Sequence, residues 1–242
     1  MSCHPEDVRG MTALLNRLVH VIPLPWRDAV WRSAFIFARQ FGRPRGLLGR
    51  LIGRGMARRN AGFNRWCVHE ISSMNKNVRR VVELGPGPGI GLQETLRAFP
   101  AASVWGVDLS PEMLAQSRKR NLEQIQSGRL TLLEGDVASL EKLAPVDIIL
   151  AVQVLYYLHQ PDAELAQLRR ALRSGGMLAL GYQLRQSILP MAQRSFPKAG
   201  HLLYDSDDEL SKLLDGAGFK EVRFLLRGPS EAPYGRLALC TA

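Results

Sequence analysis

The residue pattern with the clearest chemical meaning is an acidic side chain followed by closely spaced glycines. Glu83 precedes a run that contains Gly85, Gly87, Gly89 and Gly91. Glycine lets the backbone approach a ligand without a Cβ in the way. A turn of this kind, between a buried strand and a helix N-terminus, would hold a ligand at the carboxyl end of a parallel sheet.

The composition of this turn narrows the class of ligand. The dinucleotide fingerprint G-x-G-x-x-G does not fit, because its last glycine would fall on Ile90 or Leu92. No Gly-Lys-Ser/Thr ending follows, which excludes the phosphate loop of nucleoside triphosphatases. Glu83 would repel a pyrophosphate, whereas its carboxylate suits a positive amino group or a sulfonium. The sequence therefore predicts a cationic ligand.

The pattern Glu83-x-Gly85-x-Gly87-x-Gly89 resembles the first motif of the class I S-adenosylmethionine-dependent methyltransferases. The resemblance extends over about residues 78–182. Asp108, Gly135-Asp136 and the segment 172–176 follow in the family's order and spacing. It implies a Rossmann-like α/β fold and S-adenosyl-L-methionine as the cofactor.

Four further positions, at the ends of the second and third predicted strands, are expected to touch this cofactor. Asp108 ends a predicted strand about 20 residues beyond the glycine turn, where an acidic residue can accept hydrogen bonds from both ribose hydroxyls. An Asp at a strand end can also simply cap the next helix. The resemblance places Leu109 against the adenine. It places Asp136, with Val137 beside it, at the adenine amino group, although Gly-Asp is also an ordinary turn.

The segment after the fourth predicted strand carries the candidate catalytic residues. In the family this segment faces the cofactor sulfonium and the acceptor, and the resemblance implies that Gln153 contacts the methionine moiety. Tyr156, Tyr157 and His159 are expected to shape the acceptor pocket. We name His159 and Tyr156 as candidates for catalysis, because an unperturbed histidine pKa near 6.5 suits a general base. A structural histidine is the alternative.

The chemistry implied by the resemblance requires no protein nucleophile and no metal. A sulfonium already carries a good leaving group, so the protein supplies alignment and the exclusion of water. Cys3, Cys67 and Cys240 lie far apart and match no metal spacing. We expect them to be reduced thiols in a cytoplasmic protein, since no secretory signal and no membrane-spanning apolar run is visible.

From residue 78 onward, strand and helix patterns alternate, which predicts βαβ units and a parallel sheet. The expected strands are Arg80–Leu84, Ser103–Val107, Leu130–Glu134, Val146–Val152 and Met177–Tyr182. The expected helices are Ile90–Phe99, Pro111–Gln126, Val137–Leu143, Asp162–Arg173 and Ser206–Gly216. Residues 183–204 show no clear period. Phe219–Arg227 and Tyr234–Thr241 are expected to form a C-terminal antiparallel hairpin.

The N-terminal part differs in pattern and charge. Helices are expected at Val8–His20, Trp26–Phe41 and Leu47–Ser73, although glycines interrupt the third. Residues 1–65 hold twelve arginines against three acidic residues, and so account for +9 of the net charge of +10. We predict a basic helical extension at 1–77 and a cofactor-binding domain at 78–242. The extension would form a lid over the substrate pocket or lie on an anionic membrane surface.

Three functions are consistent with these features. The first is a methyltransferase of a small organic acceptor, for which the aromatic residues favour an apolar or aromatic molecule. The second is a methyltransferase of a lipid or prenylated quinone, with peripheral membrane contact through the basic helices. The third is a non-catalytic scaffold that retains the fold. Nucleic acid is not favoured, because no recognition motif accompanies the positive charge, and the oligomeric state stays open.

Overall fold

The computed structural model describes residues 44–74, 77–188, 190–230 and 233–242. The helices predicted at Val8–His20 and Trp26–Phe41 lie outside these residues. In the described part no helix has both the length and the apolar character that crossing a membrane requires.

The described residues form a seven-stranded sheet with the order β3-β2-β1-β4-β5-β7-β6. β1 to β5 run parallel, and β7 is inserted antiparallel between β5 and β6. This confirms the predicted Rossmann-like fold with a C-terminal hairpin. The strands are β1 (Arg80–Leu84), β2 (Ser103–Asp108), β3 (Leu130–Glu134), β4 (Val146–Val152), β5 (Leu172–Tyr182), β6 (Lys220–Arg227) and β7 (Gly235–Thr241).

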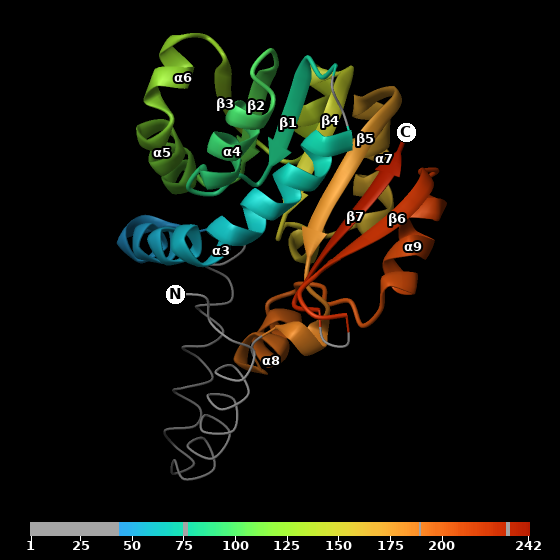
Figure 1. The fold of residues 1–242 in the computed structure, drawn as a ribbon. Helices are drawn as coiled ribbons and strands as arrows, with labels where there is room; N and C mark the ends of the chain where they lie inside the picture. Colours follow the sequence, from blue (N-terminus) through green and yellow to red (C-terminus); the bar gives the residue numbers. More distant parts are fainter. Residues whose placement is uncertain (1–43, 75–76, 189, 231–232) are drawn as a thin grey trace, which may run out of the picture.

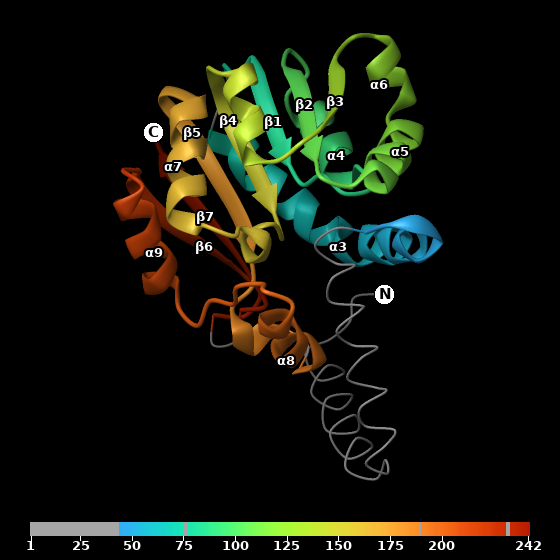
Figure 2. The same ribbon diagram turned by 180° about the vertical axis from the view of Figure 1, so that it is seen from behind.

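Helices cover both faces of this sheet (Figures 1 and 2). One face carries α3 (Gly46–Met74), α4 (Ile90–Ala98) and α5 (Pro111–Arg120), and the short α6 (Leu122–Gln126) follows α5. The other face carries α7 (Pro161–Ala171) and α9 (Asp207–Gly216). α8 (Pro190–Lys198) lies beyond the carboxyl ends of the parallel strands (Figure 1). Short 3₁₀ helices are η1 (Val137–Leu143), η2 (Leu155–Tyr157) and η3 (Arg185–Ser187).

The core consists of two apolar layers, one on each side of the sheet. Successive side chains of a strand point to opposite faces, so Ile149 packs toward α7 while Ile148 and Leu150 pack toward α3. All three are at most 1% exposed. Burial of β1 and β4 on both faces fixes the central strands whose carboxyl ends carry the site.

Two predicted helices end earlier than expected. The helix predicted over Pro111–Gln126 divides at Asn121, whose buried side chain donates to the carbonyls of Ser117 and Gly89. The helix predicted to reach Arg173 ends at Ala171, because Leu172 already pairs with β4. In both places a tertiary contact replaces the continuation of a local pattern.

The helix predicted at Leu47–Ser73 is α3, and its glycines do not break it. Two of these glycines instead let other parts of the chain come close to the helix. A Cβ at Gly53 would lie 2.5 Å from the Met113 Cε atom of α5, and one at Gly49 would lie 2.7 Å from the carbonyl carbon of Pro44. Small residues at these positions let the helix pack closely on its neighbours.

α3 also contributes to the core of the sheet. Phe63, Cys67, Val68 and Ile71 are buried in the layer that covers β1, β4 and β5. Only part of the N-terminal segment is described, so the division of the chain at residue 77 stays a prediction. The described portion packs as an integral layer of the domain.

Truncating the buried face of α3 should therefore destabilise the whole domain. Ile71 is 1% exposed, and Ile71→Ala should lower the free energy of unfolding by about 2–5 kcal/mol, the usual cost of a buried large-to-small change. His69→Ala, on the exposed side of the same helix, should change it by less than about 0.5 kcal/mol. Urea denaturation measures the free energy of unfolding of both variants. An equal loss of stability in Ile71→Ala and His69→Ala would show that α3 is not an integral layer of the domain.

Candidate functional site: a pocket at the carboxyl ends of β1, β2 and β4

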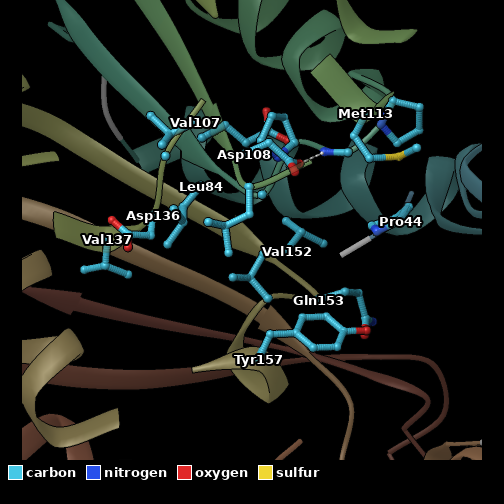
Figure 3. Close-up of a pocket in the computed structure, with 18 of the residues that line it drawn as sticks. Pro44, Leu84, Val107, Asp108, Met113, Asp136, Val137, Val152, Gln153 and Tyr157 are labelled. Atoms are coloured by element: carbon cyan, nitrogen blue, oxygen red, sulfur yellow. Dashed lines mark hydrogen bonds between the residues drawn. The ribbon is translucent and has the colours of Figure 1, made fainter. Parts of the chain in front are cut away.

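A pocket of about 130 Å³ opens where the parallel strands end. Its lining comes from the glycine turn after β1, from the ends of β2, β3 and β4, and from α3 (Figure 3). β1 lies between β2 and β4 in the middle of the five parallel strands, with Glu83 level with Gly106 and Leu150. Ligands in open α/β sheets bind at such a position.

The glycine turn adopts backbone conformations that favour glycine. Gly85, Gly87 and Gly89 have φ values of 63°, 54° and 81°, in the left-handed region. Gly85 and Gly87 line the pocket. Gly89 is not part of the lining: it packs against α5, and a Cβ there would collide with Ser117 Oγ. The third predicted glycine therefore holds the turn to α5.

Asp108 connects this turn to the end of β2. Its Oδ2 accepts a hydrogen bond from Gly87 N at 2.9 Å (Figure 3), and its Oδ1 accepts one from Ser110 N at 2.8 Å. Burial raises the pKa of Asp108, while these two backbone bonds act in the opposite direction. Each oxygen retains acceptor capacity, so Asp108 can fix the turn and still bind hydroxyl groups of a ligand in the pocket.

Glu83 is the most unusual group in the pocket. Its side chain is 2% exposed, and its Oε2 atom has no hydrogen-bond partner among the described residues. Burial, and then the neighbouring Asp108 charge, raise its pKa to about 8. A buried carboxylate without a partner is costly, and an ammonium group would relieve that cost. The residue thus fits the cationic end of a ligand.

The ends of β2 and β3 supply the opposite part of the lining. Leu109 is 39% exposed and lines the pocket beside Asp108. Asp136 caps η1, since its Oδ1 accepts from Ala138 N at 3.1 Å, and it also lines the pocket, as does the buried Val137. Asp136 can therefore both cap η1 and bind a ligand in the pocket. Figure 3 shows Leu84 and Val107 beside these groups as an apolar wall.

Gln153 follows β4 with a strained backbone. Its φ of 62° is uncommon for a residue other than glycine, and strain of this kind is often held at functional sites. Its backbone N–H donates to the Gly181 carbonyl at 2.7 Å, which holds the turn. The side chain lines the pocket together with Val152 and Tyr157 (Figure 3).

The structure does not bring Tyr156 or His159 into the lining. Tyr156 is 2% exposed, and its hydroxyl accepts from Gln183 N at 2.6 Å and donates to the Gln183 carbonyl. Burial raises its pKa. His159 is exposed. Tyr157 is the tyrosine that faces the pocket, and its ring packs edge-on against His201 at 4.7 Å.

Sequence reasoning missed the residues that α3 and its approach contribute. Pro44, Asn60 and Asn64 line the pocket. The Pro44 carbonyl accepts from Ser110 Oγ at 2.5 Å, which fixes the start of α3 beside the end of β2. Two asparagines four residues apart share one helix face, but only the docking of α3 shows that this face meets the pocket.

The described residues contain no group of three or more His, Cys, Asp or Glu side chains that could hold a metal ion. The arrangement instead suits an organic ligand. Acidic groups at three strand ends offer acceptors to an ammonium, to hydroxyls and to an amino group, and apolar side chains lie between them. S-adenosylmethionine carries these groups, so the residues present fit it.

The state of Glu83 makes the ligand-free protein sensitive to pH. The folded state holds the Glu83 proton more tightly than the unfolded state, whose value is near 4.5. The stability contributed by the neutral form is thus complete below about pH 4.5 and is lost as the pH rises through about 8. In the Glu83→Gln variant, the amide has about the same shape as the neutral carboxyl group and does not titrate.

We therefore expect wild type to lose more stability than Glu83→Gln between pH 5 and pH 9. The difference should be on the order of a few kcal/mol, at roughly 2–4 °C of Tm per kcal/mol. Asp108 is present in both proteins, so the comparison reports the titration of Glu83 together with its coupling to Asp108. Thermal unfolding without cofactor measures it, and parallel curves would show that Glu83 has an ordinary pKa.

Comparison with known proteins adds to this geometry. Residues 81–176 match a family model described as a methyltransferase domain. The chain is 38% identical over 101 residues to trans-aconitate 2-methyltransferase of Methylobacterium nodulans, covering 42% of this chain and 37% of that protein. It is 29% identical over 151 residues to malonyl-[acyl-carrier protein] O-methyltransferase of Halalkalibacterium halodurans, covering 57% and 55%. The matches thus span between about a third and just over half of these relatives.

A solved structure shows the same fold over a longer stretch. A putative O-methyltransferase from Nostoc punctiforme superposes with a TM-score of 0.63 at 15% identity, covering 80% of this chain and 59% of that chain. At this identity the likeness concerns the fold alone. The family match at residues 81–176, the similarity to named methyltransferases over this region and the shared fold together support a class I S-adenosylmethionine-dependent methyltransferase domain.

Proposed function

We propose that the protein transfers a methyl group from S-adenosylmethionine to a small organic acceptor. The observation that carries this proposal is the alignment of Glu83, Asp108 and Asp136 at the ends of β1, β2 and β3 around one pocket. Their spacing suits the amino-acid end, the ribose and the base of the cofactor in that order.

Each residue has a binding or orienting task. Glu83 holds the ammonium group, Asp108 the ribose hydroxyls, and Asp136 the adenine amino group. Leu109 and Val137 cover the adenine faces, while Gln153 and Tyr157 bound the end of the pocket where the acceptor enters. When bound, the cofactor supplies an activated methyl group on a good leaving group, so these residues serve chiefly to align it and exclude water.

The character of the pocket bears on the acceptor. Among the described residues, the pocket lining contains no Lys, Arg or His. It contains four acidic residues, Glu83, Asp108, Asp136 and Glu164. The lining beside β4 is apolar and aromatic, and Tyr157 packs on Phe196 and His201. These features favour an uncharged acceptor with apolar or aromatic surface. The two relatives reported above are named for trans-aconitate and malonyl-[acyl-carrier protein].

The alternatives proposed from the sequence receive less support. A membrane-surface enzyme would need the basic helices free to meet lipid, whereas the described face of α3 that carries Ile71 and Cys67 packs into the core. A non-catalytic scaffold would not need to keep an unpaired buried carboxylate in an open pocket. Both remain distinguishable by experiment.

Cofactor binding is tested by titrating S-adenosylhomocysteine into wild type and Asp108→Ala in a calorimeter. Losing hydrogen bonds to a charged acceptor should cost about 1.5–3 kcal/mol, or roughly ten- to a hundredfold in affinity. Asp208→Ala, exposed in the first turn of α9, serves as the matched control and should bind as wild type does. If folded wild type does not bind S-adenosylhomocysteine, the proposed methyltransferase activity is wrong.

The catalytic roles of His159 and Tyr156 stay predictions, and their positions favour structural roles. We expect His159→Ala to retain kcat within about twofold, because an exposed imidazole outside the lining cannot reach an acceptor proton. The pH profile of kcat/KM should also stay unchanged. A loss of a hundredfold or more, with a shifted profile, would instead establish a general base and require that the segment after β4 rearranges.

A further inference from the structure

The pocket holds a second polar group next to Glu83 that the family match at residues 81–176 does not include. Asn64 of α3 lines the same pocket. A Cβ at Gly91 would collide with Glu83 Oε1 and would lie 3.0 Å from Asn64 Oδ1. The two oxygen atoms therefore lie near each other beside Gly91, and both residues line the pocket.

The orientation of the Asn64 side chain is set within α3. Its Nδ2 atom donates to the Asn60 carbonyl at 3.0 Å, and its Oδ1 atom lies on the side of Gly91 and Glu83 Oε1. An amide oxygen and a carboxyl group are both acceptors when the carboxyl is ionised. Two acceptors around one partly buried space are unfavourable unless a donor lies between them.

We propose that Asn64 and Glu83 together bind the ammonium group of the cofactor, with Asn64 Oδ1 as the second acceptor. This inference rests on the proposed function, since it assumes that S-adenosylmethionine occupies the pocket. An ammonium group has three N–H donors and no acceptor, so it matches two oxygens better than a hydroxyl or an amide does.

The docking of α3 gives Asn64 a fixed position for this task. Gly46 N donates to Glu112 Oε1 at 2.7 Å near the start of the helix, and Gly53 packs on Met113. Further along the helix, Phe63 and Cys67 are buried on either side of Asn64 in sequence. A binding group on a packed helix is held more precisely than one on a loop. Asn64 is therefore a specificity-determining residue for the amino end of the cofactor.

The test compares two ligands that differ only at this group. S-adenosylhomocysteine and its deaminated analogue, with hydrogen in place of the amino group, are titrated calorimetrically into wild type and Asn64→Leu. The variant should bind S-adenosylhomocysteine about tenfold more weakly, the cost of one charge-assisted hydrogen bond. It should bind the analogue within about twofold of wild type. His69→Leu, on the exposed side of α3, should leave both affinities unchanged.

Other outcomes overturn the inference. If Asn64→Leu weakens both ligands equally, Asn64 acts through the packing of α3, and if it weakens neither, Asn64 does not contact the ammonium. Asn64→Ala provides a second variant should Asn64→Leu not fold. Asp108→Ala separates the two proposals: if it impairs both ligands while the Asn64 variants impair neither, the cofactor site stands and only this inference fails. Wild type that binds neither ligand overturns both.

Discussion

The site depends on two carboxyl groups buried together beneath one glycine turn. Asp108 is satisfied by the backbone N–H groups of Gly87 and Ser110, whereas Glu83 Oε2 has no partner in the described part of the chain. Such an arrangement is unfavourable in isolation and persists only where the surrounding structure enforces it. The cost is offset when a cation enters, so the same feature that strains the empty pocket selects its ligand.

The rest of the fold supplies the stability that this arrangement needs. β1 is the middle one of the five parallel strands, paired with β2 and β4 and covered on both faces, so the position of Glu83 is fixed by register and not by a loop. α5 holds the turn through Gly89 and Asn121. α3 closes the pocket from the side that the family match omits. The apolar layers thus hold the buried carboxyl group of Glu83 in place, although its Oε2 atom has no hydrogen-bond partner in the described part of the chain.

Much of this could be predicted because it is local. Short segments of the sequence show the hydrophobic periods of the strands and helices, the glycine turn and the acidic residues at strand ends. These local patterns suffice to predict the fold and its C-terminal hairpin. The positions of Gly85, Gly87 and Asp108 in the lining follow from the same logic. Gly89 differs because its neighbour, Ser117, is distant in sequence.

The remaining features depend on tertiary contacts that no short segment encodes. The sequence alone does not distinguish the neighbouring residues Tyr156 and Tyr157. In the structure, the 3₁₀ turn η2 buries Tyr156 against Gln183 and directs Tyr157 to the pocket. His159 follows the same turn and is exposed. Asn64 lies on a helix whose polar face carries no recognisable motif, and only the packing of α3 on α4, α5 and β5 brings it to the pocket that Glu83 lines.

The most direct measurement is a crystal structure of the protein with S-adenosylhomocysteine. We expect the ammonium group within hydrogen-bond distance of Glu83, the ribose hydroxyls on Asp108 and the adenine between Leu109 and Val137. A ligand bound elsewhere, or one with its amino group turned away from Glu83, would show that the buried carboxyl group of Glu83 does not select the cofactor.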